Sequence, residues 1–414
     1  MNTTEFDVIV VGGGASGLMA AGRAAERGKK VLLVEKNKEL GEKLKITGGG
    51  RCNITNAEFD EHVLLGNYGK AEQFLYSAFS QFGVSDTFSF FESKGLPLVV
   101  QARKRAFPQT ERALDAYNVL AKYIREGNVR VKTSSPVTRV VTESAHITKV
   151  ICGKEEYKAR SFIFATGGVS HPETGSTGDG FSWLAKLGHT ISAPTPTIVP
   201  LAVPEQWVHD LAGVSLSFMK ITFFANGARR FAATGKVLFT HFGISGPLIL
   251  NIAHKVSDLL HDGLVTAQID AFPDTNSGAL ERRIIAVFDK NKNKMLKNVF
   301  QDIAPEGTSQ SILSLLKSSV DPEKKVHSVT REERKSIVRL LKALPLTISG
   351  LMGFDRAVIA DGGVPLAEID MKTMRSKKIN NLFIVGDLLH INRPSGGYSL
   401  QLCWTTGYVA GSNA

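Results

Sequence analysis

The chain has 414 residues and a formal net charge of +11, with 43% hydrophobic and 21% charged residues. This composition is typical of a globular protein large enough for two or three domains, and it excludes an intrinsically disordered chain. Three separated cysteines without a CxxC pair exclude a disulfide framework, a zinc site and a dithiol centre, so no metal is predicted. Because the sequence shows neither a signal-peptide pattern nor a membrane-spanning apolar run, we expect a cytoplasmic protein without membrane contact.

The positive charge has two interpretations, a nucleic-acid partner or small anionic ligands. Lysine and arginine are spread along the chain, with modest clusters only at Arg103–Arg105 and Lys290–Lys297. No nucleic-acid-binding motif accompanies them. We therefore expect a small-molecule substrate rather than a nucleic acid, and the sequence does not determine the oligomeric state.

The start of the chain follows the pattern of a βαβ dinucleotide-binding unit. Phe6–Val11 is an apolar run of strand length, Gly12–Gly14 interrupt it, and Ala15–Glu26 carries small and apolar residues at helical spacing. Val31–Val34 predicts a second buried strand, and Glu35 follows directly. A glycine-rich turn without a ligand is the alternative, but strand, glycines, helix and acid in register favour a nucleotide site.

Each residue type in this unit has a chemical reason. Gly12 allows a tight turn, Gly14 lets a pyrophosphate approach the backbone, and Gly17 lets the helix pack closely on the sheet. Ala15 and Ser16 lie at the predicted helix N-terminus, where free N–H groups favour an anion.

The acid at the end of the second strand favours one class of nucleotide. The Glu35 carboxylate can accept hydrogen bonds from both ribose hydroxyls and would repel a 2′-phosphate, so FAD or NAD is favoured over NADP. We also assign its neighbour Lys36 to the cofactor site.

A second glycine-rich segment, LKITGGGRCNITN from Leu44 to Asn56, is predicted to contact the same ligand. Flexible backbone donors next to a cation can wrap around the ribityl–pyrophosphate part of a dinucleotide. The residues assigned to this role are Gly49, Gly50, Arg51, Cys52 and Asn53. Cys52 could alternatively be a redox thiol beside the cofactor, but without a partner cysteine we interpret it as a packed residue.

The remaining chain predicts a nucleotide-binding domain that is split by an insertion. Four short β segments between Val129 and Arg160 look like an antiparallel meander, and Phe162–Ala165 fits a further parallel strand. After a proline-rich linker the pattern becomes β-rich and then helical, before an apolar strand and a last helix return to the first domain. The predicted domains are 1–193 and 346–414 for cofactor binding, 194–275 for a β-rich part with a return near 330–345, and 276–330 for a small helical part.

Four motifs give the chain a resemblance to a known family. They are GGGASGLMAA with GEKLKITGGGRCNITN, then ATGGVSHPETGSTGDG, LFTHFGISGP, and GDLLHINRPSGGYSLQLCWTTGYVAG. The chain resembles the aminoacetone-oxidase-like bacterial flavoproteins, also known as NAD(P)/FAD-dependent oxidoreductases, a family that includes a bile-acid enone reductase. One departure is His171, where the family usually has tyrosine, so no role is assigned to that side chain.

The resemblance implies an α/β fold: a split Rossmann-like FAD-binding domain of the two-dinucleotide-binding-domain type, with an inserted β-barrel-like domain and a small helical domain. The strand end at Asp387 looks like the acid that accepts a bond from a ribityl hydroxyl, unless it is only a strand-end cap. Together with the segment at Gly49 to Asn53, the implied cofactor contacts are Val137, Ala165, Thr166, Gly167, Gly168, Gly386, Asp387, Gly396, Gly397, Tyr398, Ser399 and Leu400.

The expected activity is hydride transfer at flavin N5 between FAD and a small amine, aminoketone or enone, with dioxygen or NAD(P)H as the other redox partner. A second GxGxxG after a strand is missing, so a nicotinamide would bind transiently and without a Rossmann site. His241 in the THFGISGP loop is the candidate acid–base residue, with a structural role in the loop as the alternative. Arg393 and Tyr398 are candidates for the substrate entrance, with a purely structural role as the alternative for each. A flavin-dependent RNA-modifying or RNA-binding protein is the rival hypothesis.

Overall fold

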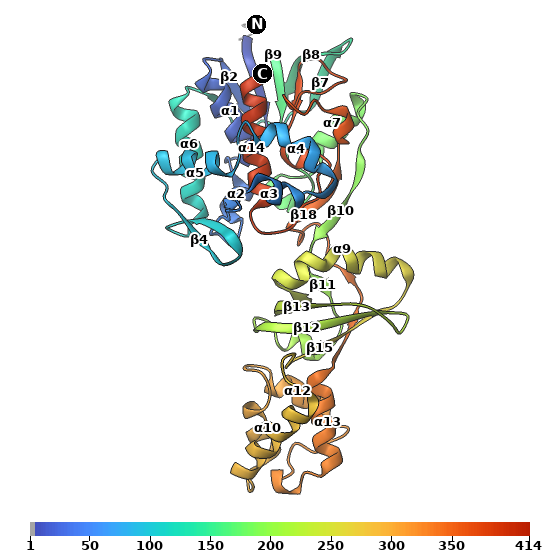
Figure 1. Cartoon of the computed structure of the whole chain (residues 1–414). Coiled ribbons are helices and arrows are strands. Elements are labelled where there is room, and N and C mark those ends of the chain that lie inside the picture. Colours follow the sequence, from blue (N-terminus) through green and yellow to red (C-terminus); the bar gives the residue numbers. More distant parts are fainter. Residues whose placement is uncertain (1–4) are drawn as a thin grey trace. The chain divides into compact units, whose positions relative to one another are not determined.

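The computed structural model describes residues 5–414, which group into two compact units (Figure 1). The first unit runs to Pro196 and resumes at Val358–Ala414, and the second is Thr197–Ala357. The sequence places the return to the first unit at residue 346, whereas the structure places it at Val358. The reason is that residues 344–348 and 350–351 form strands that pair inside the second unit.

A seven-stranded sheet forms the centre of the first unit, in the order β6-β2-β1-β9-β8-β7 with β19 paired to β9. β6, β2, β1, β9 and β19 run parallel, and β7, β8 and the start of β9 are antiparallel. The strand bounds are β1 Glu5–Val11, β2 Val31–Val34, β6 Arg130–Lys132, β7 Arg139–Glu143, β8 His146–Cys152, β9 Glu155–Phe164 and β19 Leu382–Ile384. This arrangement confirms the α/β fold with a Rossmann-type domain.

Two details of the predicted meander are wrong. Arg130–Lys132 is not part of it, because these residues pair in parallel with β2 at the edge of the main sheet. Glu155–Phe164 is one strand where two are predicted: its start pairs with β8, and the rest pairs with β1 and β19. In both cases the partner strand is distant in sequence, so local alternation could not identify it.

Helices cover this sheet, and two of them pack unusually closely. α1 (Ala15–Glu26) lies beside α14 (Tyr398–Asn413), where a Cβ on Gly407 would come within 2.5 Å of the Ser16 carbonyl oxygen (Figure 1). The other helices are α2 Glu42–Ile46, α3 Glu61–Gly66, α4 Glu72–Phe79, α5 Val84–Ser93, α6 Ala113–Glu126 and α7 Asp179–Lys186. The smaller sheets are formed by β3 Thr55–Asn56, β4 Leu98–Gln101 and β5 Arg105–Pro108, and by β10 Ser192–Ile198 with β18 Ile359–Gly363.

The second unit contains a seven-stranded sheet in the order β16-β15-β12-β13-β14-β11-β17. Its edge strands β16 and β17 are joined by Ser349 alone, so the sheet must curl until its edges meet, as in a barrel. The strands are β11 Leu201–Ala202, β12 Ser215–Ala225, β13 Ala228–Thr240, β14 Gly243–Ser245, β15 Val265–Asp270, β16 Leu344–Ile348 and β17 Gly350–Leu351. The helices are α8 Gln206–His209, α9 Pro247–Asp262, α10 Ser277–Lys290, α11 Leu296–Val299, α12 Ser309–Leu316 and α13 Arg331–Lys342.

The β-rich and helical parts of this unit share one apolar core rather than forming two separate domains. Residues of the sheet such as Phe223 and helical residues such as Ile337 belong to the same cluster of buried side chains.

Within residues 5–414, no helix has the length and apolar character needed to cross a membrane, and no group of side chains forms a metal site.

Candidate cofactor site

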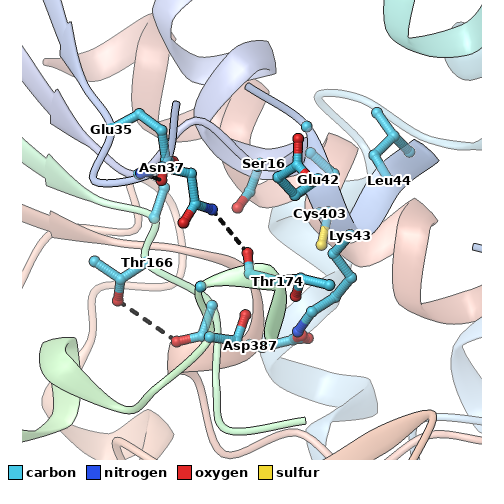
Figure 2. A pocket seen from close by; sticks show the side chains of 18 of the residues that line it. Ser16, Glu35, Asn37, Glu42, Lys43, Leu44, Thr166, Thr174, Asp387 and Cys403 are labelled. Atoms are coloured by element: carbon cyan, nitrogen blue, oxygen red, sulfur yellow. Dashed lines mark hydrogen bonds between the residues drawn. The ribbon is translucent and has the colours of Figure 1, made fainter. Parts of the chain in front are cut away.

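A groove lies at the carboxyl ends of β1, β2 and β9, and all of its lining comes from the first unit (Figure 2). It contains about 1230 Å³ of space, counting its open mouth. The lining combines the glycine-rich turn at Gly12–Gly14, Glu35 and the segment from Asp387 to Cys403, so one ligand can contact all three. Its lining residues are Val11, Gly12, Gly14, Ala15, Ser16, Val34, Glu35, Lys36, Asn37, Gly41, Glu42, Lys43, Leu44, Thr47, Ser135, Val137, Ala165, Thr166, Gly167, Thr174, Gly175, Ser176, Asp179, Trp183, Val358, Ile359, Asp387, Ser399, Leu400 and Cys403.

The N-terminus of α1 is shaped to accept an anion. A Cβ on Gly14 would meet no atom within 4 Å, so the backbone is open at the groove, and α1 begins there without a side-chain cap. Gly17 has a different role: its Cβ would lie 1.9 Å from the Gly12 carbonyl oxygen, so only glycine lets the helix approach the strand. Free N–H groups at a helix start are a ready-made phosphate site.

Glu35 is held in place by two backbone groups. Its Oε2 accepts a hydrogen bond from the Gly13 N–H at 2.7 Å, and its Oε1 accepts one from the Asn37 N–H at 2.8 Å. The side chain is buried. A carboxylate has about four acceptor positions, so two stay available for ribose hydroxyls.

The opposite wall of the groove is the loop that follows β9. Asn37 donates from its amide to the Thr174 carbonyl at 2.9 Å (Figure 2). Lys36 donates to Thr177 at 2.5 Å and to Asp179 at 2.7 Å. These contacts join the end of β2 to residues 174–179, which follow the ATGG segment. The sequence analysis assigned Lys36 to the site and used this loop's motif for the family resemblance, but it did not assign residues 174–179 to the site.

A charged cluster lies deeper in the groove. The buried Arg393 guanidinium donates to Asp387 Oδ1, to the Ser399 hydroxyl at 3.0 Å and to the Ile391 carbonyl at 2.7 Å. The prediction that Arg393 lines the substrate entrance is therefore wrong, because its charge is satisfied inside the protein. Lys43 and Cys403 line the groove nearby and were not predicted (Figure 2).

The start of α14 is held by the second glycine-rich segment. With its amide oriented to satisfy both groups, Asn53 accepts from the Gly397 N–H at 3.0 Å and donates to the carbonyls of Ala106 and Thr55. Asn56 donates to the Gly396 carbonyl at 3.2 Å. Motifs far apart in sequence thus meet at one helix N-terminus.

The predicted cofactor contacts divide into two groups. One group lines the groove: Gly12, Gly14, Ala15, Ser16, Glu35, Lys36, Val137, Ala165, Thr166, Gly167, Asp387, Ser399 and Leu400. The other group lies behind or beside it: Gly17, Gly49, Gly50, Arg51, Cys52, Asn53, Gly168, Gly386, Gly396, Gly397 and Tyr398.

Three members of the second group have their side chains engaged with the protein. Burial raises the pKa of the Cys52 thiol to about 12, so it is neither accessible nor a thiolate. Arg51 lies over the Phe107 ring at 4.6 Å, and Tyr398 is buried against Tyr68. Placing Tyr398 at the substrate entrance is therefore wrong.

His241 belongs to the second unit, in the turn between β13 and β14. The residue is exposed, and its ring centroid lies 4.9 Å from that of Phe242. His171, the departure from the family pattern, pairs with Glu173 at 2.7 Å.

The family described as "HI0933-like protein Rossmann domain" matches residues 6–413. The chain belongs to this family. It is 28% identical over 408 residues to a Clostridium scindens protein named 3-dehydro-bile acid delta(4,6)-reductase, covering 98% of each chain. It is 26% identical over 407 residues to a Haemophilus influenzae protein named ribosomal RNA dihydrouridine synthase, covering 97% of this chain and 96% of the other.

Solved structures share the fold at low sequence identity. A 3-ketosteroid-delta4-(5alpha)-dehydrogenase from Rhodococcus jostii RHA1 aligns with a TM-score of 0.56 at 15% identity, covering 99% of this chain and 96% of the other. A flavocytochrome c3 fumarate reductase aligns with a TM-score of 0.50 at 16% identity, covering 100% and 78%. The family is one of FAD-binding flavoenzymes, so this HI0933-like chain is a flavin-dependent oxidoreductase, and the resemblance seen in its sequence is confirmed.

The groove fits FAD on its own geometry. An open, uncapped helix start suits the pyrophosphate of FAD, and the Glu35 carboxylate at the end of β2 suits its ribose.

Proposed function

We propose that this HI0933-like protein is an FAD-dependent reductase of carbon–carbon double bonds conjugated to a carbonyl group. Two relatives support this choice through the chemistry that their names share. A 3-dehydro delta(4,6) bile acid is a conjugated dienone, and dihydrouridine is uridine whose ring double bond, conjugated to a carbonyl, has been reduced. The observation that carries the proposal is a groove whose helix start and Glu35 fit FAD, in a chain that matches both relatives over nearly its whole length.

The residues around the groove have distinct roles in this proposal. Gly14, Ala15 and Ser16 would hold the pyrophosphate, Glu35 the ribose, and Asp387 a ribityl hydroxyl. The start of α14, at Ser399 and Leu400, presents backbone N–H groups that favour negative charge on a bound ligand. FAD, when bound, supplies the two-electron redox chemistry.

The electron donor and the place of action are also part of the proposal. NADH or NADPH would deliver the electrons transiently, because the chain has no second dinucleotide motif. Three free cysteines agree with a reducing compartment such as the cytoplasm.

His241 is our proposed proton donor, since it is exposed in the turn between β13 and β14 and imidazole is a common general acid. If it acts in this way, His241→Asn lowers turnover by about 10²–10⁴-fold while FAD stays bound. A reduction rate per folded enzyme close to that of the wild type would instead show that His241 only supports its loop.

A second candidate is the same reaction on a uracil base in RNA. The name of the Haemophilus relative and the net charge of +11 favour it. Arg103 and Lys104 at the tip of the β4–β5 hairpin are exposed cations that RNA phosphates would attract.

One experiment tests the proposal and separates the two candidates. The FAD-loaded enzyme is reduced anaerobically with NADH or NADPH and then mixed with a steroid dienone or with uracil-containing RNA, while flavin absorbance is followed. In a separate arm the oxidised enzyme is mixed anaerobically with a small amine. Rapid reoxidation by the dienone or the RNA supports conjugated-bond reduction and names the substrate class. Reduction of the oxidised enzyme by the amine, without reoxidation by either acceptor, would overturn it.

A further inference from the structure

One lysine of the groove lacks the ion pair that its neighbours have. Lys43 in α2 donates to the Ser170 hydroxyl at 3.3 Å, and within residues 5–414 no carboxylate oxygen lies within 4.0 Å of its ammonium. Lys36, also in the groove, pairs with Asp179 at 2.7 Å. Lys45, two residues further along α2, pairs with Glu39 and Glu42 and lies over the Tyr117 ring.

The carboxylates near Lys43 are already engaged by other side chains. Figure 2 shows its side chain reaching from α2 across the groove towards Asp387, whose carboxylate is already paired with the buried Arg393. Glu173, the other nearby carboxylate, pairs with His171 at 2.7 Å. Burial lowers the pKa of Lys43 by more than Asp387 raises it, so the protein alone holds this ammonium at an energetic cost.

Lys43 lines the same groove as Ala15 and Ser16 at the start of α1. A Cβ on Gly386 would lie 2.8 Å from Ser16 Oγ and 3.6 Å from Cys403 Sγ, so Cys403 lies close to the start of α1. Burial raises the pKa of the Cys403 thiol to about 12, and the charges of Asp387 and Lys43 also act on that thiol. The Lys43 ammonium and the start of α1 therefore both lie near the Cys403 thiol.

We propose that Lys43 binds the diphosphate of the dinucleotide together with the N-terminus of α1. A helix start supplies about half a positive charge, whereas a diphosphate brings two negative charges, so a further cation is required close by. This assignment rests on FAD being the cofactor, but not on the substrate or the reaction.

The test is FAD affinity, measured by flavin fluorescence on apo-protein, beside thermal unfolding of the same apo-protein. Lys43→Met should weaken FAD binding about 10–100-fold, the range for losing a charged hydrogen bond. It should leave the apo-protein at least as stable as the wild type, because a costly buried charge is removed. Lys43→Arg should restore most of the affinity, and the control Lys45→Met should bind FAD within about threefold of the wild type.

A pair of competing ligands locates the interaction. ADP-ribose, which contains the diphosphate, should lose affinity for Lys43→Met, whereas adenosine, which lacks it, should not. Unchanged FAD affinity would overturn the proposal, and so would a shifted flavin potential at unchanged affinity. Loss of both affinity and apo-protein stability would make Lys43 a structural residue. A wild-type protein that binds no FAD would refute the cofactor itself.

Discussion

Two helices start at the cofactor groove, and their N-termini are built in different ways. Both begin at a glycine without a side-chain cap, Gly14 for α1 and Gly397 for α14. The start of α1 is fixed mainly by backbone: Gly12 N–H donates to the Val34 carbonyl, and Gly41 N–H donates to the Gly13 carbonyl.

The start of α14 is fixed by side chains instead. Asn53 holds Gly397, Thr55 donates to the Gln401 amide oxygen at 2.6 Å, and Tyr68 donates to the Tyr398 carbonyl at 2.9 Å. The comparison teaches that the start of α1 is held by glycine backbone and by Glu35 from the same βαβ unit, whereas the start of α14 depends on side chains from distant segments.

The largest expected effect is steric and lies at the backbone-held end. In Gly17→Val, the added Cβ would lie 1.9 Å from the Gly12 carbonyl oxygen, so strand and helix must separate. We expect a loss of about 3 kcal/mol or more in the free energy of unfolding, measured with urea. The control Gly14→Ala should fold normally, because its Cβ meets no atom within 4 Å, yet it should bind FAD more weakly. Equal stability of the two variants would contradict the close approach.

This difference also explains how much could be predicted. Strand, glycines, α1 and Glu35 are adjacent in sequence and carry a periodic pattern, so their roles follow from spacing alone. The α14 end depends on pairs such as Thr55 and Gln401, 346 residues apart, whose contact no local pattern predicts.

The sequence analysis predicted neither the role of Lys43 nor helix α9, for different physical reasons. In the sequence, Lys43 cannot be distinguished from a solvent-exposed lysine, because the charge of Asp387 comes close to it only in the folded chain. α9 follows the β-rich THFGISGP segment without a polar capping residue, since Gly246 precedes its first residue, Pro247.

The second prediction removes a charge from the side-chain-held end. Arg393→Met leaves Asp387 without its partner in a largely buried site. Breaking such a pair costs about 3 kcal/mol, so urea unfolding should shift accordingly, with FAD affinity falling in parallel. Arg393→Lys keeps the charge and should lose less, although it cannot reach Ser399 and Ile391 with the same geometry. A fully stable Arg393→Met variant would show that this end does not depend on its ion pair.

The third prediction removes the contact between the two glycine-rich motifs. Asn53→Ala frees the Gly397 N–H and two carbonyls, so we expect a loss of about 1–2 kcal/mol in stability and a more mobile α14 start. The control Asn67→Ala removes an exposed amide that bonds only the Val63 carbonyl, and it should change stability by less than about 0.5 kcal/mol. Identical unfolding curves for both variants would remove Asn53 from the support of α14.

The last prediction uses pH to compare β2, which leads to Glu35, with β19, which leads to Asp387. Glu368 and Ser376 precede β19 in the chain and bond His189: Nδ1 bonds Glu368 at 2.7 Å, and Nε2 bonds the Ser376 hydroxyl at 2.9 Å, within a buried cluster. Burial lowers the pKa of His189 by more than Glu368 raises it, so the folded protein favours neutral imidazole. Its stabilisation is present above pH 6.5 and is lost as the pH falls below that value.

Glu368 extends this loss into stronger acid. Burial alone would raise its pKa, but hydrogen bonds from Lys378, Thr190 and His189 lower it to about 2. Its contribution is present above pH 4.5 and declines towards pH 2. Hydrogen exchange should therefore show the amides of β19 opening earlier on acidification than those of β2. Glu368→Gln should flatten the wild-type loss of stability below pH 4.5, whereas Glu332→Gln, at an exposed pair in the second unit, should change it less. An equal increase in the amide exchange rates of β2 and β19 would mean that acid destabilises the whole unit rather than the His189–Glu368 cluster beside β19.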